Sequence, residues 1–355
     1  MTGAPSPSPE PGPGLATAYL GLDLPSPLVA SASPLTRDPE TVARLERSGA
    51  GAVVMPSLFE EEVLHEEIEL NRALEAGTEH FAEALDYFPA VTDFQTTAER
   101  YLSSLRANKA AVRIPVMASL NATSSGGWVR YANLVEEAGA DALELNLYRV
   151  AADPDRTAED VEASDLRLVA DVRAATGIPL AVKLSPYYSS FANFARRVVE
   201  AGADGLVVFN RFYQPDLDVE TLDVVPRHQL SQSWETRLPQ RWIAILRPQL
   251  GARASLAATT GVHSGTDAAK LLLVGADVVM TTSALLLRGP EHLGTMRDEV
   301  LGWMGEHGYE SVAQLRGSVS RSAAEDPGAF ERANYVRGLK SWAAPEDLTP
   351  SSPTA

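Results

Sequence analysis

The chain has 355 residues, of which 45% are hydrophobic and 22% charged, so it can bury a sizeable core in one or two domains. It contains no cysteine, which excludes disulfides, thiolate metal sites, iron–sulfur clusters and a cysteine nucleophile. A formal net charge of −17 argues against a nucleic-acid partner, because phosphate backbones are bound by basic surfaces. We therefore expect any phosphate group to be held locally, by backbone amides.

Both ends of the chain are rich in Pro, Ser and Gly and contain few apolar residues. Residues 1–14 and 343–355 are therefore predicted to be disordered tails around one domain at 15–342. No apolar run approaches the roughly 20 residues that span a bilayer, and the N-terminus lacks the basic-then-apolar order of a signal peptide. These observations predict a cytoplasmic protein with no membrane partner.

Between the tails the chain repeats one pattern, a short apolar run followed by a loop and a segment with helical periodicity. The apolar runs predict eight strands, at 27–31, 51–55, 114–119, 141–147, 178–184, 204–210, 254–259 and 277–282. The periodic segments predict helices at 38–50, 95–109, 126–140, 164–177, 193–203, 242–252, 265–276 and 289–308.

Short apolar strands that alternate with helices indicate an α/β fold with a parallel sheet buried on both faces. Eight such units indicate a single closed (β/α)8 TIM barrel. A doubly wound open sheet is the alternative, less favoured because no strand is followed by a G-x-G-x-x-G turn. Two segments interrupt the pattern, an insertion at 58–113 after the second strand and residues 211–241. Both follow a strand, so each could form a lid over the active-site face or the contact of a homodimer.

The C-terminal ends of barrel strands carry the active groups, and in this sequence they carry amides, hydroxyls and one lysine. The absence of a carboxylate pair, a histidine cluster or a Ser/His/Asp set there argues against hydrolysis through an activated nucleophile. No metal site is predicted, since the glutamates at 60–69 resemble a solvated helix face. Lys183 stands out because the chain has four lysines against 26 arginines. It either snorkels to the surface or faces an anion, where it could stabilise a reduced flavin or form a Schiff base.

The last two loops that follow strands contain small residues and hydroxyls. The segment "TTGVHSGTD" places Gly261 and Gly265 at the start of a helix, and "VMTTSAL" offers hydroxyls and backbone amides one strand later. Loops after strands 7 and 8 are the usual phosphate pocket of a TIM barrel, with a helix N-terminus among the donors. The alternative is that these residues only make tight turns.

The segments "LVASAS", "ELNL", "AVKLSPY", "VVFN", "TTGVHSGTDAAKLLLVGAD" and "VMTTSALL" resemble, in order and spacing, the FMN-binding barrel of the dihydroorotate dehydrogenases across about residues 17–315. The resemblance implies an FMN that takes a hydride from dihydroorotate while a Cys or Ser removes a proton, and a role in pyrimidine biosynthesis. By position it implies flavin-binding roles for Ala30, Ser31, Ser57, Asn121, Asn146, Lys183, Asn210, Thr260, Gly261, Thr282 and Ser283. Lys183 would lie at the flavin N1/O2 edge, and Asn146 and Asn210 would also contact the substrate.

The loop after the fourth strand departs from the family pattern. The family reads Asn-Leu-Ser-Cys-Pro-Asn, whereas this chain reads Asn-Leu-Tyr-Arg-Val-Ala at 146–151, and the family lysine after the second strand becomes Pro56. The position of the base falls on Arg149, which cannot act as a base near neutral pH. Arg149 could instead bind a substrate carboxylate. The hydroxyls that could replace the base are those of Tyr148, Ser124 and Ser125.

Three functions stay open. The first is an FMN-dependent dehydrogenase of the CH–CH type that oxidises dihydroorotate or a related small carboxylated substrate. Lys183, Asn146 and Arg149 would act in catalysis, and Asn146, Asn210 and Arg149 in substrate binding. The second is a flavin-binding protein without dehydrogenase activity, acting as a partner or regulatory subunit, because the base is missing. The third is a barrel without flavin in which Lys183 forms a Schiff base, as in an aldolase.

Overall fold

The structure is a computed structural model that describes residues 14–63, 65–66, 96–121, 128–212, 214–225 and 229–320. The predicted tails lie outside these residues except for Gly14, whose N–H donates to the carbonyl of Glu310 at 2.9 Å. The larger part of the insertion, residue 64 and 67–95, also lies outside them. Its predicted role as a lid or dimer contact therefore stays a prediction.

Eight parallel strands close into a barrel, which confirms the predicted fold and excludes the open sheet. In barrel order they are β3 (Leu28–Ala30), β4 (Ala52–Val54), β6 (Val116–Asn121), β7 (Ala142–Asn146), β8 (Leu180–Leu184), β9 (Gly205–Val208), β12 (Ser255–Ala258) and β13 (Val278–Thr281). The ring closes because β3 pairs with both β13 and β4, and β4 pairs with β6. Each strand overlaps a predicted apolar run, as expected for strands that are covered on both faces.

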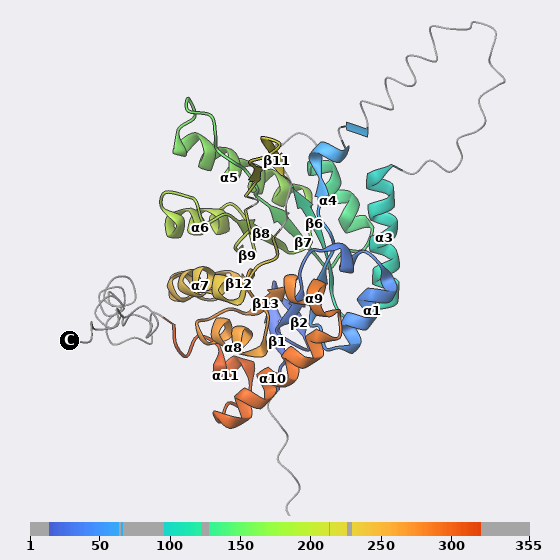
Figure 1. The fold of residues 1–355 in the computed structure, drawn as a ribbon, viewed down its shortest axis with the longest axis vertical. Helices are drawn as coiled ribbons and strands as arrows, with labels where there is room; N and C mark the ends of the chain where they lie inside the picture. Colours follow the sequence, from blue (N-terminus) through green and yellow to red (C-terminus); the bar gives the residue numbers. More distant parts are fainter. Residues whose placement is uncertain are drawn as a thin grey trace, which may run out of the picture.

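The barrel is surrounded by helices on its outer face. They are α1 (Pro39–Arg47), α3 (Thr97–Ala111), α4 (Trp128–Glu137), α5 (Ala158–Ala175), α6 (Phe191–Glu200), α7 (Arg237–Leu250), α8 (Gly265–Leu273) and α10 (His292–Glu306). Figure 1 shows α5 to α8 along one side of the strands and α1, α3 and α4 along the other. Each of them overlaps a predicted helix, and α5 begins six residues before its predicted start. The reason is local, since Thr157 and Asp160 form a capping box at Ala158.

Several short elements were not predicted, because two to six residues are too few to show a period. They are β1 (Thr17–Tyr19), β2 (Leu22–Leu24), β5 (Leu58–Phe59), β10 (Asp216–Asp218), β11 (Asp223–Val225), α9 (Ser283–Arg288) and α11 (Val312–Leu315). The antiparallel pair of β10 and β11 lies within the long segment after β9, and β5 extends the sheet beside the end of β6. None of the helices among the described residues is long and apolar enough to cross a membrane.

The antiparallel pair of β1 and β2 closes the barrel at the end where its strands begin. Tyr19 and Leu20 pack with apolar residues that the strands direct inward, in one buried cluster. The N–H of Leu20 donates to Ser255 Oγ at 2.9 Å, and the Leu20 side chain occupies the space above Gly205. A Cβ on Gly205 would lie only 2.5 Å from Leu20 Cδ2. Apolar groups therefore fill this end of the barrel, and the polar interior positions lie toward the opposite end.

The alternation of side chains along β7 illustrates how polar groups reach the interior. Ala142 belongs to the inner cluster, whereas Leu143 and Leu145 pack outward against the helices. Because successive side chains of a strand point to opposite faces, Glu144 and Asn146 point into the barrel. Glu144 is 1% exposed and Asn146 is 5% exposed, so both are shielded from bulk solvent.

Candidate active site

Two adjoining cavities lie at the end of the barrel where the strands finish, one of about 960 Å³ and one of about 250 Å³. Six residues line both of them, namely Ala32, Lys183, Asn210, Arg211, Thr282 and Ser283. The two cavities therefore form one elongated site that passes the Lys183 side chain. This is the position at which active sites form in TIM barrels.

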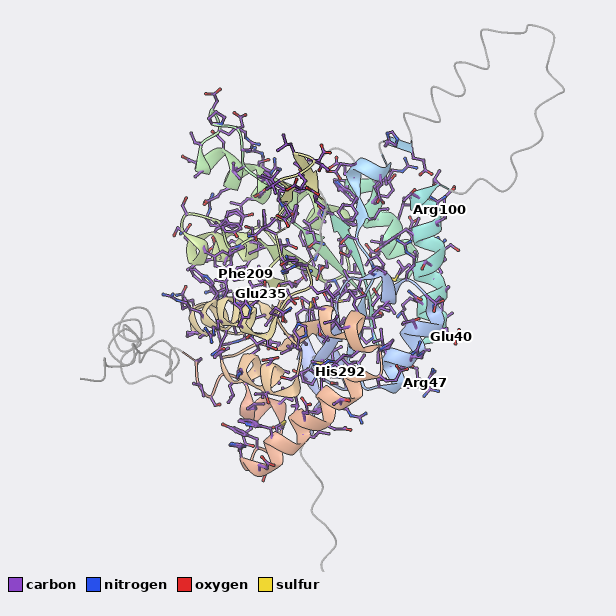
Figure 2. All side chains as sticks on the ribbon, viewed as in Figure 1. Glu40, Arg47, Arg100, Phe209, Glu235 and His292 are labelled. Carbon is purple, nitrogen blue, oxygen red and sulfur yellow. The ribbon has the colours of Figure 1, made fainter. Side chains whose placement is uncertain are left out.

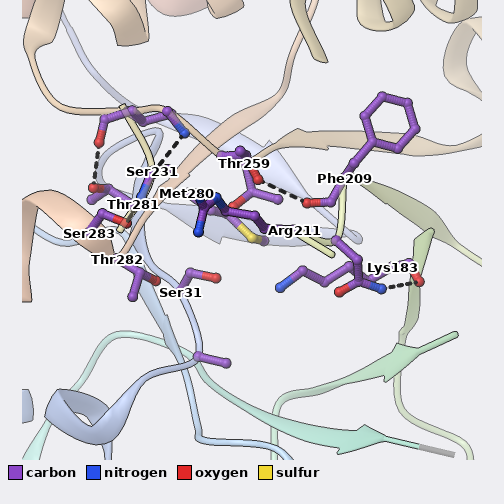
Figure 3. A pocket seen from close by; sticks show the side chains of 15 residues that line it. Ser31, Lys183, Phe209, Arg211, Ser231, Thr259, Met280, Thr281, Thr282 and Ser283 are labelled. Atoms are coloured by element: carbon purple, nitrogen blue, oxygen red, sulfur yellow. Dashed lines mark hydrogen bonds between the residues drawn. The ribbon is translucent and has the colours of Figure 1, made fainter. Parts of the chain in front are cut away.

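The smaller cavity has a wall of hydroxyls and backbone amides. The Ser283 hydroxyl accepts hydrogen bonds from the Ser231 N–H at 3.1 Å and the Ser231 hydroxyl at 2.9 Å. Figure 3 shows Ser231, Thr282 and Ser283 on one side of this cavity and Lys183 on the other. The loop after β12 completes the wall, and there Thr260 and Gly261 have positive φ values of 81° and 79°. Four of the residues to which the resemblance gives a flavin-binding role line this cavity, namely Thr260, Gly261, Thr282 and Ser283.

Gly261 is required at its position by both its backbone conformation and its close neighbours. A Cβ there would lie 2.6 Å from the backbone nitrogen of Thr236 and 2.8 Å from the carbonyl oxygen of Gln232. The loop thus packs directly on the backbone that leads into α7. A side chain would push the loop toward the cavity, so the glycine sets the shape of the wall.

Of the two helix N-termini that follow β12 and β13, α9 faces the cavity and α8 does not. The N–H of Gly265, the first residue of α8, donates to the Glu299 carboxylate of α10 at 2.5 Å. The Asp267 carboxylate accepts from the Ser264 hydroxyl and the His263 N–H, which further occupies this end. By contrast Ser283, the first residue of α9, lines both cavities. The expectation that Gly265 helps to hold a phosphate is therefore not supported.

Lys183 extends from β8 into the site and is paired with a buried carboxylate. Its Nζ lies 3.4 Å from Oε1 of Glu144, and the two side chains are 12% and 1% exposed. The strand register places Lys183 beside Asn146, so Glu144 lies two residues deeper in the barrel. Lys183 lines both cavities, which excludes the alternative of a lysine that snorkels to the surface.

Asn146 is held by two hydroxyls at the wall of the larger cavity. Its Nδ2 donates to Ser57 Oγ at 2.9 Å and to Ser119 Oγ at 3.1 Å. Its Oδ1 is buried and has no hydrogen-bond partner among the described residues. The backbone of Ser119 is fixed in turn by the Tyr101 hydroxyl, at 2.8 Å from its nitrogen. Burial raises the pKa of Tyr101 above its usual range, so this hydroxyl stays protonated. The Asn146 side chain is therefore held in one orientation at the wall of the larger cavity.

The loop after β7 directs Tyr148, and not Arg149, to the larger cavity. The Tyr148 ring stacks on Phe212 with centroids 4.7 Å apart, and both residues line the cavity. Arg149 lines neither cavity, and its Nε lies 3.5 Å from Oδ1 of the buried Asp165 on α5. The Tyr188 hydroxyl donates to the same carboxylate at 3.0 Å. The predicted roles of Arg149 in catalysis and substrate binding find no support in this geometry.

Burial raises the pKa of Asp165, whereas the hydrogen bond from Tyr188 and the charge of Arg149 act in the opposite direction. Burial also raises the pKa of Tyr188 well above its usual range, and the Asp165 charge adds to that effect. These groups tie the loop after β7 to the loop after β8 at the outer face of the barrel. Arg149 thus helps to connect the loop after β7, through Asp165, to Tyr188 in the loop after β8.

Most of the other predicted site residues line the cavities. Ser31 lines the smaller one, Ser57, Asn121 and Asn146 line the larger one, and Asn210 lines both. Ala30 is the exception, since it is 1% exposed and packs outward against the helices, whereas Ala32 lines both cavities. Of the proposed replacement bases, Ser124 and Ser125 lie outside the described residues.

The sequence indicated that residues 211–241 could form a lid or a dimer contact, but none of them was assigned to the site. The residues of this segment that line the larger cavity are Arg211, Phe212, Gln214, Pro215, Asp216, Gln229 and Leu230. Arg211 is oriented by Glu235, whose Oε1 lies 3.1 Å from its Nε. A third cavity lies beside the first two, and its lining includes Arg211 and Glu235 together with Phe209; Figure 2 labels Phe209 and Glu235. The available signal was the position of Arg211 directly after Asn210, at a strand end.

The donors and acceptors of the site fit FMN. The smaller cavity offers hydroxyls and the start of α9 to a phosphate, and Lys183 supplies a cation where the two cavities join. The unpartnered Oδ1 of Asn146 can accept a hydrogen bond from a ring N–H. The described residues contain no cluster of three or more His, Asp or Glu side chains that could hold a metal ion.

Comparison with known proteins identifies the family. The family model described as dihydroorotate dehydrogenase matches residues 94–304, more than half of the chain. The putative dihydroorotate dehydrogenase A (fumarate) of Aeropyrum pernix is 29% identical over 59% of this chain and 69% of its own length. The dihydroorotate dehydrogenase B (NAD(+)) catalytic subunit of Pyrococcus abyssi is 24% identical over 84% and 96%. The NAD-dependent dihydropyrimidine dehydrogenase subunit PreA of Escherichia coli K12 is 22% identical over 86% and 76%. The chain belongs to the dihydroorotate dehydrogenase family.

Proposed function

We propose that this protein is an FMN-dependent oxidoreductase that dehydrogenates dihydroorotate or a related small ring substrate. The observation that carries the proposal is the pair of joined cavities, with a polar end for a phosphate and with Lys183 at the junction. The family membership supports the same chemistry, and relatives are named as acting on dihydroorotate or on dihydropyrimidines.

When bound, FMN supplies the acceptor for a hydride. In this proposal Thr260, Gly261, Thr282 and Ser283 hold its phosphate, and Lys183 lies beside its ring. Asn146 orients the ring through Oδ1, since its Nδ2 is already held by two serine hydroxyls. The apolar end of the barrel, closed by β1 and β2, excludes water from below the site.

The substrate occupies the remaining part of the larger cavity in this proposal. The amides of Asn121 and Asn210 offer donors and acceptors to a ring that carries amide or carboxylate groups, and Arg211 offers a positive charge. We assign removal of the substrate proton to Tyr148, whose side chain would accept this proton as a phenolate and be left as a phenol. Tyr148 comes from the loop that carries the base in the family, and it lines the cavity, whereas Arg149 pairs with Asp165.

A second candidate is a flavin-binding protein without dehydrogenase activity. It is favoured by the orientation of Arg149, because the residue at the position of the base is held at the outer face of the barrel. The Schiff-base hypothesis is disfavoured by Glu144. Its carboxylate lies 3.4 Å from Lys183 Nζ, and bonding this nitrogen to a carbonyl carbon would break the buried ion pair.

An absorption spectrum of the purified protein, followed by identification of the released cofactor, tests the proposal first. Anaerobic mixing with dihydroorotate and, separately, with dihydrouracil should then bleach the flavin. The Tyr148→Phe variant should bind FMN as the wild type does but should be reduced at least tenfold more slowly. If bound FMN is reduced by neither compound, the second candidate is favoured. A protein that cannot be reconstituted with FMN would refute both flavin-based proposals.

A further inference from the structure

Glu144 and Lys183 form an ion pair inside the barrel, directly under the site. The proposed reaction uses the lysine but assigns no role to the glutamate. Glu144 is 1% exposed, and its Oε1 lies 3.4 Å from Lys183 Nζ. Its Oε2 has no hydrogen-bond partner among the described residues. The carboxylate is therefore held mainly by the charge of a single lysine.

The two groups of the ion pair lie at different depths in the barrel. Lys183 lines the cavities, whereas Glu144 lies two residues deeper, toward the apolar end of the barrel. Tyr19, from the segment that closes that end, is buried below, and the Glu144 charge adds to the effect of burial in raising its pKa. A ligand in the cavities therefore meets the ammonium first and the carboxylate behind it.

This arrangement reduces the positive charge that acts on the site. A lone ammonium in a poorly solvated pocket would favour every anionic species near it. With a carboxylate behind it the pair has no net charge, so its field is strong only next to Nζ. An anion in contact with Lys183 is still favoured, but less than it would be by an unpaired lysine.

A purely structural role does not account for Glu144. Buried carboxylates in folded proteins usually accept several hydrogen bonds, and Oε2 accepts none from the described residues. The residues beside Glu144 are Ala181 on β8 and Ser119 on β6. Ala142 lies two residues deeper, so small uncharged side chains surround this position. A buried ion pair commonly adds less stability than apolar residues of the same size.

We propose that Glu144 is a positioning residue that holds the Lys183 ammonium at the junction of the cavities and lowers the reduction potential of the bound flavin. The inference rests on the proposed binding of FMN and concerns how strongly this site favours the reduced, anionic flavin. Removing the carboxylate charge while keeping its size should therefore raise the potential. It should also strengthen the binding of anions that react with the flavin.

The test is the Glu144→Gln variant loaded with FMN, measured by spectroscopic redox titration and by titration with sulfite. We expect at least a tenfold shift of the two-electron equilibrium toward reduced flavin, a rise of about 30 mV. We also expect at least tenfold tighter sulfite binding. Lys183→Met should change both quantities in the opposite direction. Glu144→Asp, which keeps the charge, should stay within threefold of the wild type.

The matched control is Glu306→Gln, which removes one carboxylate from the exposed end of α10 and should change neither quantity. A Glu144→Gln protein that binds FMN with unchanged potential and sulfite affinity would overturn the inference, and so would a lower potential. If the glutamine variant does not fold, Glu144→Ala and the aspartate variant are compared instead, with the same criteria. A wild type that binds no FMN would refute the proposed function itself, and that result is separate from the behaviour of the variants.

Discussion

The glycine at position 261 provides a quantitative test of the structure of the phosphate end. Gly261 is buried, has φ of 79°, and a Cβ on it would lie 2.6 Å from the backbone nitrogen of Thr236. A residue with a Cβ pays roughly 1–2 kcal/mol to adopt the left-handed conformation. Contact with rigid backbone adds about 1–3 kcal/mol. We therefore expect Gly261→Ala to lower the free energy of unfolding by about 2–5 kcal/mol.

Two other glycines separate these contributions. Gly139 has φ of 92°, and a Cβ on it would have no neighbouring atom within 4 Å, so Gly139→Ala should lower the free energy of unfolding by only about 1–2 kcal/mol. Gly302 lies in the interior of α10 with open space around it, and it has no positive φ. Gly302→Ala should therefore raise the free energy of unfolding by about 0.5–1 kcal/mol.

Urea unfolding followed by tryptophan fluorescence measures all three variants on one scale, and titration with FMN measures the site. Gly261→Ala should also bind FMN at least tenfold more weakly, because the displaced loop forms the wall of the smaller cavity. The Gly139→Ala protein should bind FMN as the wild type does. If Gly261→Ala is no less stable than Gly139→Ala, the loop does not pack on the backbone before α7 as described.

Four further predictions concern the contact between Arg149 and Asp165 and the end of the barrel that β1 and β2 close. Arg149→Ala should lower the free energy of unfolding by about 2–3 kcal/mol in urea titrations, by leaving the buried Asp165 without its cation, yet leave FMN affinity unchanged. A substantially weaker affinity would place Arg149 in the site after all. Because burial raises the Asp165 pKa, the folded protein binds the proton of this carboxyl group more tightly than the unfolded chain does. The free energy of unfolding of the wild type should therefore fall as pH rises above about 4. Asp165→Asn should lack this component, and a wild-type-minus-variant difference that does not change with pH would contradict the assignment. Tyr19→Phe removes a buried hydroxyl without a partner among the described residues and should raise the unfolding free energy by about 1 kcal/mol. Leu20→Ala should lower the free energy of unfolding by about 2–5 kcal/mol. If Leu20→Ala and Tyr19→Phe changed the free energy of unfolding equally in the same assay, the described packing of Leu20 would be refuted.

The positions that line the site were predictable wherever a strand ends. Parallel strands in a barrel bring all their C-terminal ends to one face, so Lys183, Asn146 and Asn210 must converge once eight strands are recognised. Ala30 was assigned to the flavin although it packs outward. The sequence does not show on which face a three-residue buried strand places each side chain, because both faces are apolar.

Contacts between distant segments decided the remaining features. Glu299 on α10 occupies the start of α8, which removes Gly265 from the phosphate site. Asp165 and Tyr188 hold Arg149 at the outer face and leave the cavity to Tyr148. Each of these partners lies far along the chain from the group it holds, so no local pattern indicates the pairing.

The amino-acid sequence by itself determined the eight strands, most of the helices and the chemical character of the mouth of the barrel. It could do so because hydrophobic periodicity, apolar runs and helix caps are local features, each set by a few neighbouring residues. Tertiary structure alone decided which of two adjacent loop residues reaches the cavity and which helix start faces it. It also placed a buried carboxylate beneath the lysine of the site. Those outcomes depend on ion pairs and hydrogen bonds between separate strands and helices, which exist only after the barrel has closed.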